Sequence, residues 1–341
     1  MSSVIIRAAL VLHRYKLAGK PPVLFLGSDL WPVTLPSLAE RYLRRTGALS
    51  GDREHQRTLE VSVTDTTAVV VRWQGLSENE RIGEWLEVFD RRWSESSRDE
   101  QFTFLDEQFR SAGRPESVQA VSEWIAEGYF DLIFTTDVSS GLEDALADRG
   151  LRRRDVLYLP LDSYSADQIR FAAGASVHVP RIKIIKLNGD LYTWNFWISP
   201  RELHRRKDQQ KALIRDMASL AIISLGHSAL FDVDLNQVAK ENGCDFISAS
   251  AGDVASLHQW LQTFQKLPEQ ARPAFFQLPP DVLMAVLQAH GPGDVESLAQ
   301  AMEAELAQER LLVQLTDVVE ILDEDQTAGK SNGEETISPS S

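Results

Sequence analysis

The sequence predicts an α/β protein with a doubly wound, Rossmann-like parallel sheet, a helical insertion and a small helical appendage near its C-terminal end. Short apolar runs that end in polar turns recur along 21–265, and helical patterns of about ten residues separate several of them. Parallel strands need such crossover connections, and strands buried on both faces read as continuous apolar runs. The 341 residues are enough for one large core with additions.

The N-terminal part is expected to form one helix and then the first βα unit. Residues 1–20 carry apolar side chains at helical spacing, which predicts an amphipathic helix that ends before Pro21 and Pro22. VLFLG at 23–27 then reads as a buried strand, and SLAERYLRR after Pro36 as the helix that follows it.

An insertion, mostly helical, is expected at 51–127. Apolar residues recur at steps of three or four between Asn79 and Glu127, which predicts helices. LEVSVTDTTAVVVRW at 59–73 alternates and is rich in Val and Thr, so it is expected to form paired strands around Asp65, with a helix as the alternative.

The parallel core is expected to resume after the insertion. Apolar runs predict strands at 131–136, 156–160, 182–187, 221–226 and 245–250. Helices are predicted between them, the longest from Pro200 to about Ser219, where Ser199 and Glu202 have the spacing of a capping box. Any ligand pocket should then lie at the carboxyl ends of the strands.

The C-terminal region changes character after Pro268. Residues 266–322 predict a small appendage of two helices joined across Gly291–Gly293. Residues 323–341 contain too few apolar side chains to offset the entropy of ordering, so a disordered acidic tail is expected there.

Charge and cysteine content exclude several classes of protein. The formal net charge is -15, which opposes phosphate binding over a whole surface, so no direct nucleic-acid partner is expected. The one cysteine, Cys244, cannot build a disulfide framework or a four-cysteine zinc site, so we expect no zinc and a cytoplasmic location. No apolar run reaches about 20 residues, so no membrane span is expected.

Four turns that follow predicted strands carry the polar residues of interest. They are Gly27-Ser28-Asp29-Leu30-Trp31, Thr135-Thr136-Asp137-Val138-Ser139, Lys186-Leu187-Asn188-Gly189-Asp190 and Leu225-Gly226-His227-Ser228. Their order and strand context resemble the pocket of the sirtuin-like (silent information regulator two-like) family, in its zinc-free bacterial branch. That pocket uses Gly-Ala-Gly, Thr-Thr-Asn-x-Asp, Lys-Leu-His-Gly and Gly-x-Ser turns, and the resemblance covers about 21–265.

The resemblance implies a site for NAD or ADP-ribose at these turns. The cofactor-binding positions it implies are Gly27, Ser28, Thr135, Thr136, Asp137, Asn188, Gly189, Gly226 and Ser228. A glycine turn before a helix lets backbone N–H groups approach a pyrophosphate. Only Gly27 remains of the first glycine pair, however, and Asp29 and Trp31 occupy positions that the family gives to the second glycine and to serine.

The residue types required for catalysis are replaced. Asn188 stands where the family has its general base histidine, and an amide does not titrate near neutral pH. Asp137 stands at the family's asparagine; it adds negative charge beside a pyrophosphate, and the alternative that we favour is a helix N-cap formed by Asp137, Ser139 or Ser140. His227 could line the pocket, but a lone histidine at a strand end is more often structural.

Two further patterns have a structural and a functional interpretation. Asp232 and Asp234 form a DxD pair, which is far less than a metal signature, so no metal site is expected. The helix after Pro200 is locally basic; it is either a solvated face or a docking surface for an acidic partner or for the chain's own acidic tail.

The sequence-based hypothesis is therefore a catalytically degenerate sirtuin-like protein. The resemblance implies a regulatory or assembly component of a bacterial signalling or anti-phage defence system, which acts with a protein partner or as a homo-oligomer and retains partial nucleotide binding. One alternative is an active NAD-cleaving enzyme, a glycohydrolase or an ADP-ribosyl transferase or deacylase, that uses Asp137 or His227. The other is a structural module that binds no nucleotide.

Overall fold

The computed structural model describes residues 3–48, 58–61, 69–72, 78–174, 180–218, 220–228 and 232–309. The chain divides into two compact units, one comprising Val11–His258 and the other Met1–Leu10 with Gln259–Ser341. The sequence placed a boundary at 265, seven residues later. Helix α1 (Ser3–Leu17) and helix α10 (Val254–Lys266) each have residues in both units.

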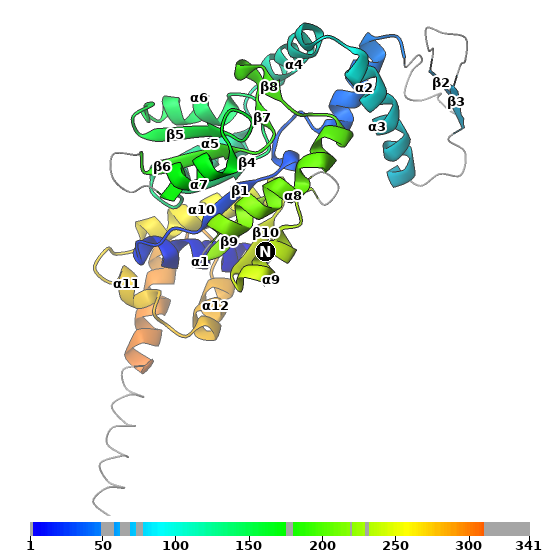
Figure 1. Cartoon of the computed structure of the whole chain (residues 1–341). Helices are drawn as coiled ribbons and strands as arrows, with labels where there is room; N and C mark the ends of the chain where they lie inside the picture. The colour runs from blue at the N-terminus through cyan, green and yellow to red at the C-terminus, as the bar shows by residue number, and fades with distance from the viewer. Residues whose placement is uncertain are drawn as a thin grey trace, which may run out of the picture. The chain divides into compact units, whose positions relative to one another are not determined.

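The larger unit contains a sheet of six strands in the order β10-β9-β1-β4-β6-β5. Every neighbouring pair is parallel. The strands are β1 (Val23–Leu26), β4 (Leu132–Thr135), β5 (Val156–Pro160), β6 (Ile182–Lys186), β9 (Ala221–Leu225) and β10 (Asp245–Ala249). All six lie where the sequence predicted strands, and the doubly wound α/β fold class is confirmed (Figure 1).

The turns after β1 and β9 lie where the sheet stops growing on one side of β1 and begins to grow on the other side. From β1 the chain adds strands on one side, through β4 to the edge strand β5, and later adds β9 and β10 on the other side of β1. Phe25 of β1 lies between Phe134 of β4 and Ser224 of β9. In open parallel sheets this switch point is the usual place for a ligand crevice.

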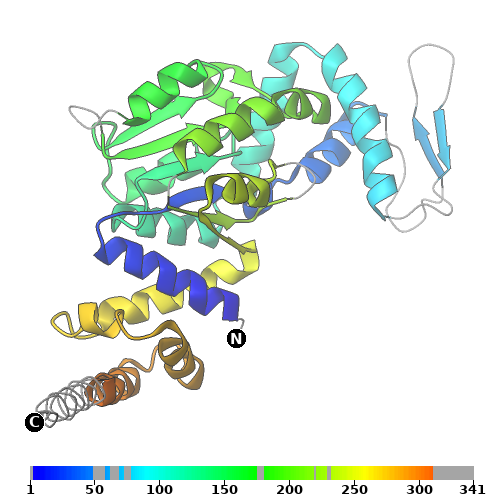
Figure 2. The same cartoon turned by 60° about the horizontal axis from the view of Figure 1, so that its bottom comes forward.

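Helices lie against the sheet (Figure 1, Figure 2). One face of the sheet has an apolar core of buried side chains. On that face α7 (Ala166–Gly174), α8 (Pro200–Met217) and α9 (Leu235–Asn242) pack against alternate strand residues. Ile169, Leu213 and Val238 come from these helices and are fully buried with Phe25 and Ile185 of the strands. The other sheet-associated helices are α5 (Glu116–Ala126) and α6 (Gly141–Asp148).

A second apolar core lies next to the carboxyl ends of the strands. It joins α2 (Leu35–Arg45), α3 (Glu78–Glu95) and α4 (Arg98–Ala112) to the segment 191–198. The ring of Tyr42 makes edge contacts of 5.1 to 5.6 Å with Phe89, Trp93 and Phe104. The helical part of the expected insertion therefore forms a layer beside the candidate pocket.

Helix α4 is fixed to the small hairpin of β7 (Gly189–Asp190) and β8 (Asn195–Phe196). The Arg98 guanidinium donates hydrogen bonds to the carbonyl oxygens of Trp194 (3.2 Å) and Phe196 (2.7 Å), and it lies 3.9 Å from the centroid of the Phe196 ring. Phe102 stacks on Trp194 with a centroid separation of 4.7 Å and an interplanar angle of 5°. These contacts hold the helical layer over the turn that carries Asn188.

The insertion also contains the expected paired strands. Strands β2 (Thr58–Val61) and β3 (Val69–Arg72) form an antiparallel pair in which Thr58 lies opposite Arg72. Asp65, around which the pairing was expected, lies outside the described residues.

The smaller unit is helical in its described part. It contains α11 (Arg272–Phe275) and α12 (Pro280–Ala289), residues 295–309 are also helical, and Phe264 packs edge-on against Phe276 at 5.0 Å. The expected tail at 323–341 and the end of the expected appendage at 266–322 lie outside the described residues. Within the described part of the chain, no helix has the length and apolarity needed to span a bilayer.

Candidate functional site

The turns after β1 and β9 are in direct contact through one carboxylate. Oδ2 of Asp232 accepts hydrogen bonds from the backbone N–H groups of Ser28 (3.2 Å) and Ser228 (2.7 Å), and the Ser28 hydroxyl lies 3.5 Å away. Asp232 is only 5 % exposed. The backbone N–H groups of two implied cofactor-binding residues are therefore bound by the chain's own side chain.

The glycines of these two turns allow this contact. A Cβ atom on Gly27 would lie 2.4 Å from the Gly226 carbonyl oxygen, and one on Gly226 would lie 2.4 Å from the Leu30 nitrogen. Gly226 also has a φ of +64°, which a non-glycine residue adopts only with strain. Both glycines are thus required for the packing of the turns on each other.

Burial raises the pKa of Asp232 to about 6. The hydrogen bonds from Ser228 and Ser28 and the nearby His227 ring favour the ionised form and reduce this effect. Asp234 has a different role, since its side chain accepts a hydrogen bond from the Gln237 N–H and caps α9. Among the described residues no group of three or more His, Cys, Asp or Glu side chains could hold a metal ion.

Of the three residues expected to cap α6, Asp137 and Ser140 do not bond a helical N–H group, whereas Ser139 bonds the first one. Asp137, in the turn after β4, accepts the N–H of Ser139 at its Oδ1 (3.0 Å) and the Ser139 hydroxyl at its Oδ2 (2.6 Å). The first helical N–H, that of Gly141, is bound by the Ser139 oxygen at 3.2 Å, and Ser140 donates instead to Asp144. The physical reason is local: an Asp side chain readily bonds backbone N–H groups two residues ahead, which forms a turn before the helix. Burial raises the pKa of Asp137.

Asn188, at the position of the family's histidine, is held by two neutral hydrogen bonds. Its Nδ2 donates to the Thr136 carbonyl oxygen, and its Oδ1 accepts from Nε2 of Gln210, both at 3.0 Å. Gln210 is buried and also donates to the Leu187 carbonyl oxygen. The Asn188 amide therefore links two strand-end turns to α8, and it carries no group that titrates near neutral pH.

A buried lysine lies beside these turns. The Nζ atom of Lys186 donates to the Ser139 carbonyl oxygen (2.6 Å), to Oε1 of Glu143 (2.8 Å) and to Oδ2 of Asp190 (2.7 Å). Its side chain is 1 % exposed. Burial alone lowers the pKa of Lys186, but Glu143, Asp137 and Asp190 outweigh that effect, so the net pKa is raised and the ammonium group stays charged. Burial raises the pKa of Glu143 despite this ion pair.

Little space remains where the resemblance implied a dinucleotide. The crevice between the turns and the helical layer holds a cavity of about 50 Å³, whose lining includes Ser28, Trp31, Asp137, Asn188 and Asp232. Drug-sized ligand pockets measure roughly 300 to 1,000 Å³. Trp31 is 7 % exposed and its indole ring lies in this crevice, as its position in the sequence suggested, whereas Asp29 is exposed and does not line the cavity.

The other residues singled out from the sequence differ in where they lie relative to the small cavity. Of the nine implied cofactor positions, Ser28, Thr136, Asp137 and Asn188 line the small cavity, and the other five do not. His227 is half-buried and its Nε2 pairs with the Val233 carbonyl oxygen at 2.8 Å. The Ser199–Glu202 capping box of α8 is confirmed.

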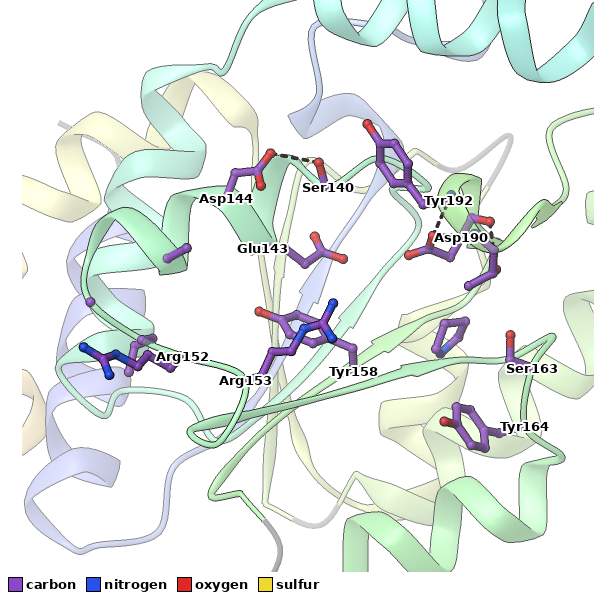
Figure 3. A pocket seen from close by; sticks show the side chains of 15 residues that line it. Ser140, Glu143, Asp144, Arg152, Arg153, Tyr158, Ser163, Tyr164, Asp190 and Tyr192 are labelled. Atoms are coloured by element: carbon purple, nitrogen blue, oxygen red, sulfur yellow. Dashed lines mark hydrogen bonds between the residues drawn. The ribbon is translucent and has the colours of Figure 1, made fainter.

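Sequence reasoning missed a much larger cleft on the other side of α6. Its volume is about 1090 Å³, and it lies along the edge strand β5 (Figure 3). Its lining includes Glu143 and Asp144 of α6, Arg152 and Arg153 before β5, and Tyr158 of β5. The signal that could have indicated it is the run Arg152-Arg153-Arg154 directly before an edge strand that contains a tyrosine.

Comparison with known proteins does not assign the chain to a family. No protein-family model matches the chain, and no curated protein matches it.

Proposed function

We propose that this chain is a catalytically silent sirtuin-like protein that neither cleaves NAD nor holds it in the crevice between the strand-end turns. In this proposal the domain serves as a regulatory or assembly component and acts through recognition. The bacterial signalling or defence setting comes from the resemblance of the four turns, and it is part of the same proposal.

The single observation that carries the proposal is the bonding of Asn188. A general base must accept a proton at the working pH, and it must lie within hydrogen-bond reach of the proton that it removes. The Asn188 amide fails the first requirement because it does not titrate near neutral pH, and its Nδ2 and Oδ1 are already bound to Thr136 and Gln210.

The neighbouring polar groups do not replace the missing base. His227 is bonded to a carbonyl oxygen of its own loop, and both Asp137 oxygens are bonded to Ser139. Asp232 has a raised pKa, but its Oδ2 is held by the N–H groups that would bind phosphate. Negative charge at that position also opposes a pyrophosphate.

The size of the crevice supports the absence of a dinucleotide. A volume of about 50 Å³ is less than the lower end of the range for ligand pockets, and Trp31 would have to leave the crevice before a nucleotide could enter. The sheet and its turns are then a scaffold, whose exposed surfaces are available for a protein partner or a second copy.

The experiment is incubation of the purified full chain with NAD, with nicotinamide release and thermal unfolding as the two measurements. We expect no release above a buffer blank and no stabilisation by excess NAD or ADP-ribose, because a ligand that binds the native state raises its apparent stability by mass action. A cooperative unfolding transition shows that the inactive protein is folded.

The alternative, an active NAD-cleaving enzyme, makes the opposite prediction. Nicotinamide release that disappears in His227→Ala or Asp137→Asn, and persists in the matched variant His204→Ala, would overturn the proposal. His204 is an exposed residue of α8 that does not line the crevice, so its removal controls for a contaminating activity.

A further inference from the structure

The large cleft along β5 is separate from the crevice at the switch point. It is bounded by α6, by the loop 149–155, by β5 and by the turn that carries Asp190 and Tyr192. Its volume of about 1090 Å³ exceeds that of the crevice about twentyfold and is large enough for a nucleotide-sized ligand.

One buried cation, Lys186, compensates part of the negative charge of the cleft. Lys186 forms ion pairs with Glu143 and with Asp190, and Oδ1 of Asp190 accepts the N–H groups of Tyr192 and Thr193. Among the described residues, the Asp144 carboxylate has one hydrogen-bond partner, the Ser140 hydroxyl, at 2.8 Å. Asp144 can therefore accept further hydrogen bonds from a ligand.

The basic side chains of the cleft have no anionic partner. Arg152 and Arg153 are exposed, and within the described part of the chain neither guanidinium group forms an ion pair or a hydrogen bond. Figure 3 shows Arg153 extending toward the middle of the cleft, over Tyr158 and below Glu143. Guanidinium groups bind phosphate oxygens in a bidentate geometry.

Aromatic rings complete the lining. Tyr192 is 50 % exposed and, with Ser140 and Asp144, also lines a smaller adjoining cavity of about 190 Å³. Figure 3 places these three residues together at one end of the cleft. Tyr158 is half-buried, and its hydroxyl group has no hydrogen-bond partner among the described residues.

We propose that this cleft binds a nucleoside phosphate, with the phosphate at Arg153, the ribose hydroxyls donating to Asp144, and the base against the ring of Tyr192. The proposal goes beyond the function proposed above and does not depend on it. Two parts of the cleft differ in chemistry, since its middle offers the Arg153 cation and one end offers a carboxylate and an aromatic face (Figure 3). An acidic peptide would meet the carboxylate of Asp144, and a basic one would meet Arg153, so neither matches the whole cleft.

The test is calorimetric titration of the full chain with AMP at low salt, with adenosine and inorganic phosphate as separate probes. We expect AMP to bind more tightly than either probe. Arg153→Ala should weaken AMP by roughly tenfold and leave adenosine unchanged, as expected for the loss of charge-assisted hydrogen bonds to the phosphate. Tyr192→Ala should weaken AMP and adenosine alike.

Arg154→Ala is the matched control. Arg154 follows Arg153 directly, is 79 % exposed, pairs with Asp155 at 3.8 Å and does not line the cleft. Its loss should change AMP affinity by less than about twofold. Absence of AMP binding by the unmodified chain at millimolar concentration would overturn the proposal. So would equal losses in Arg153→Ala and Arg154→Ala, or phosphate alone binding as tightly as AMP. NAD turnover in the other crevice would leave this outcome unaffected.

Discussion

Replacement of Lys186 with methionine removes the only cation that contacts Glu143 and Asp190 in the described structure, and it leaves both carboxylates beside each other. The side chain of Lys186 is 1 % exposed, and those of Glu143 and Asp190 are 20 % and 14 % exposed. Methionine fills a similar volume, so the variant changes charge and hydrogen bonding more than packing.

The size of the effect follows from what remains after the substitution. Removal of one partner of a buried ion pair costs roughly 3 to 5 kcal/mol, because the other charge is left without compensation. Glu143 and Asp190 retain some contact with solvent, which reduces that cost. We therefore expect the free energy of unfolding to fall by about 3 kcal/mol, the lower end of this range.

Equilibrium unfolding in urea measures this change, and Lys211→Met is the matched control. Lys211 lies 3.1 Å from Glu241 in an ion pair whose side chains are 24 % and 34 % exposed. A pair with this exposure contributes at most about 1 kcal/mol. A loss in Lys186→Met no larger than in Lys211→Met would refute the reasoning.

The pH dependence gives an independent check. Burial already raises the pKa of Glu143 above its ordinary value, and loss of the lysine raises it further. A carboxyl group with a raised pKa in the folded state is most favourable when it is protonated, so its stability contribution is lost as pH rises through that pKa. The difference in unfolding free energy between Lys186→Met and the unmodified chain should therefore shrink as the pH is lowered from neutral. A difference that stays constant would contradict this account.

Two further substitutions test the contact between the turns after β1 and β9. In thermal unfolding, Gly226→Ala should destabilise the chain by more than Gly243→Ala. Both glycines have φ +64°, which costs an alanine roughly 1 kcal/mol, but of the two only Gly226 has another atom close to the new Cβ, at 2.4 Å. Equal losses of stability in the two variants would contradict the close approach of the turns. Asp232→Asn should flatten the pH dependence of stability between about pH 4 and pH 6, measured by urea unfolding at several pH values. The Asp232 carboxyl group, with a pKa of about 6 in the fold, stabilises the native state at low pH and loses this contribution as it ionises. An unchanged pH profile would contradict the raised pKa of Asp232.

The fold could be predicted from the sequence because its signals are local. Each central strand is a short apolar run that ends in a polar turn, and the strands buried on both faces show no alternation that could be confused with a surface strand. The position of the polar turns at one edge of the sheet followed from the parallel arrangement alone. The expected site residues at Ser28, Thr136, Asp137 and Asn188 do come together there.

The bonding within the site could not be predicted, because it depends on partners distant in sequence. Gln210 reaches Asn188 from 22 residues away, and Lys186 reaches Glu143 across 43 residues. Which of Asp137, Ser139 and Ser140 would cap α6 could not be predicted either, since an Asp or Ser side chain can bond backbone groups in a turn or at a helix start. The large cleft depends on which strand lies at the edge of the sheet, and the sequence did not specify that order.

The attachment of α4 to the β7–β8 hairpin determines how the crevice could ever open. Phe109 of α4 lines the small cavity, and the same helix is fastened by the Arg98 hydrogen bonds and by the stack of Phe102 on Trp194. Rotation of Trp31 alone leaves this lid in place, so admission of any large molecule also requires α4 to separate from the hairpin, with loss of the Arg98 and Phe102 contacts.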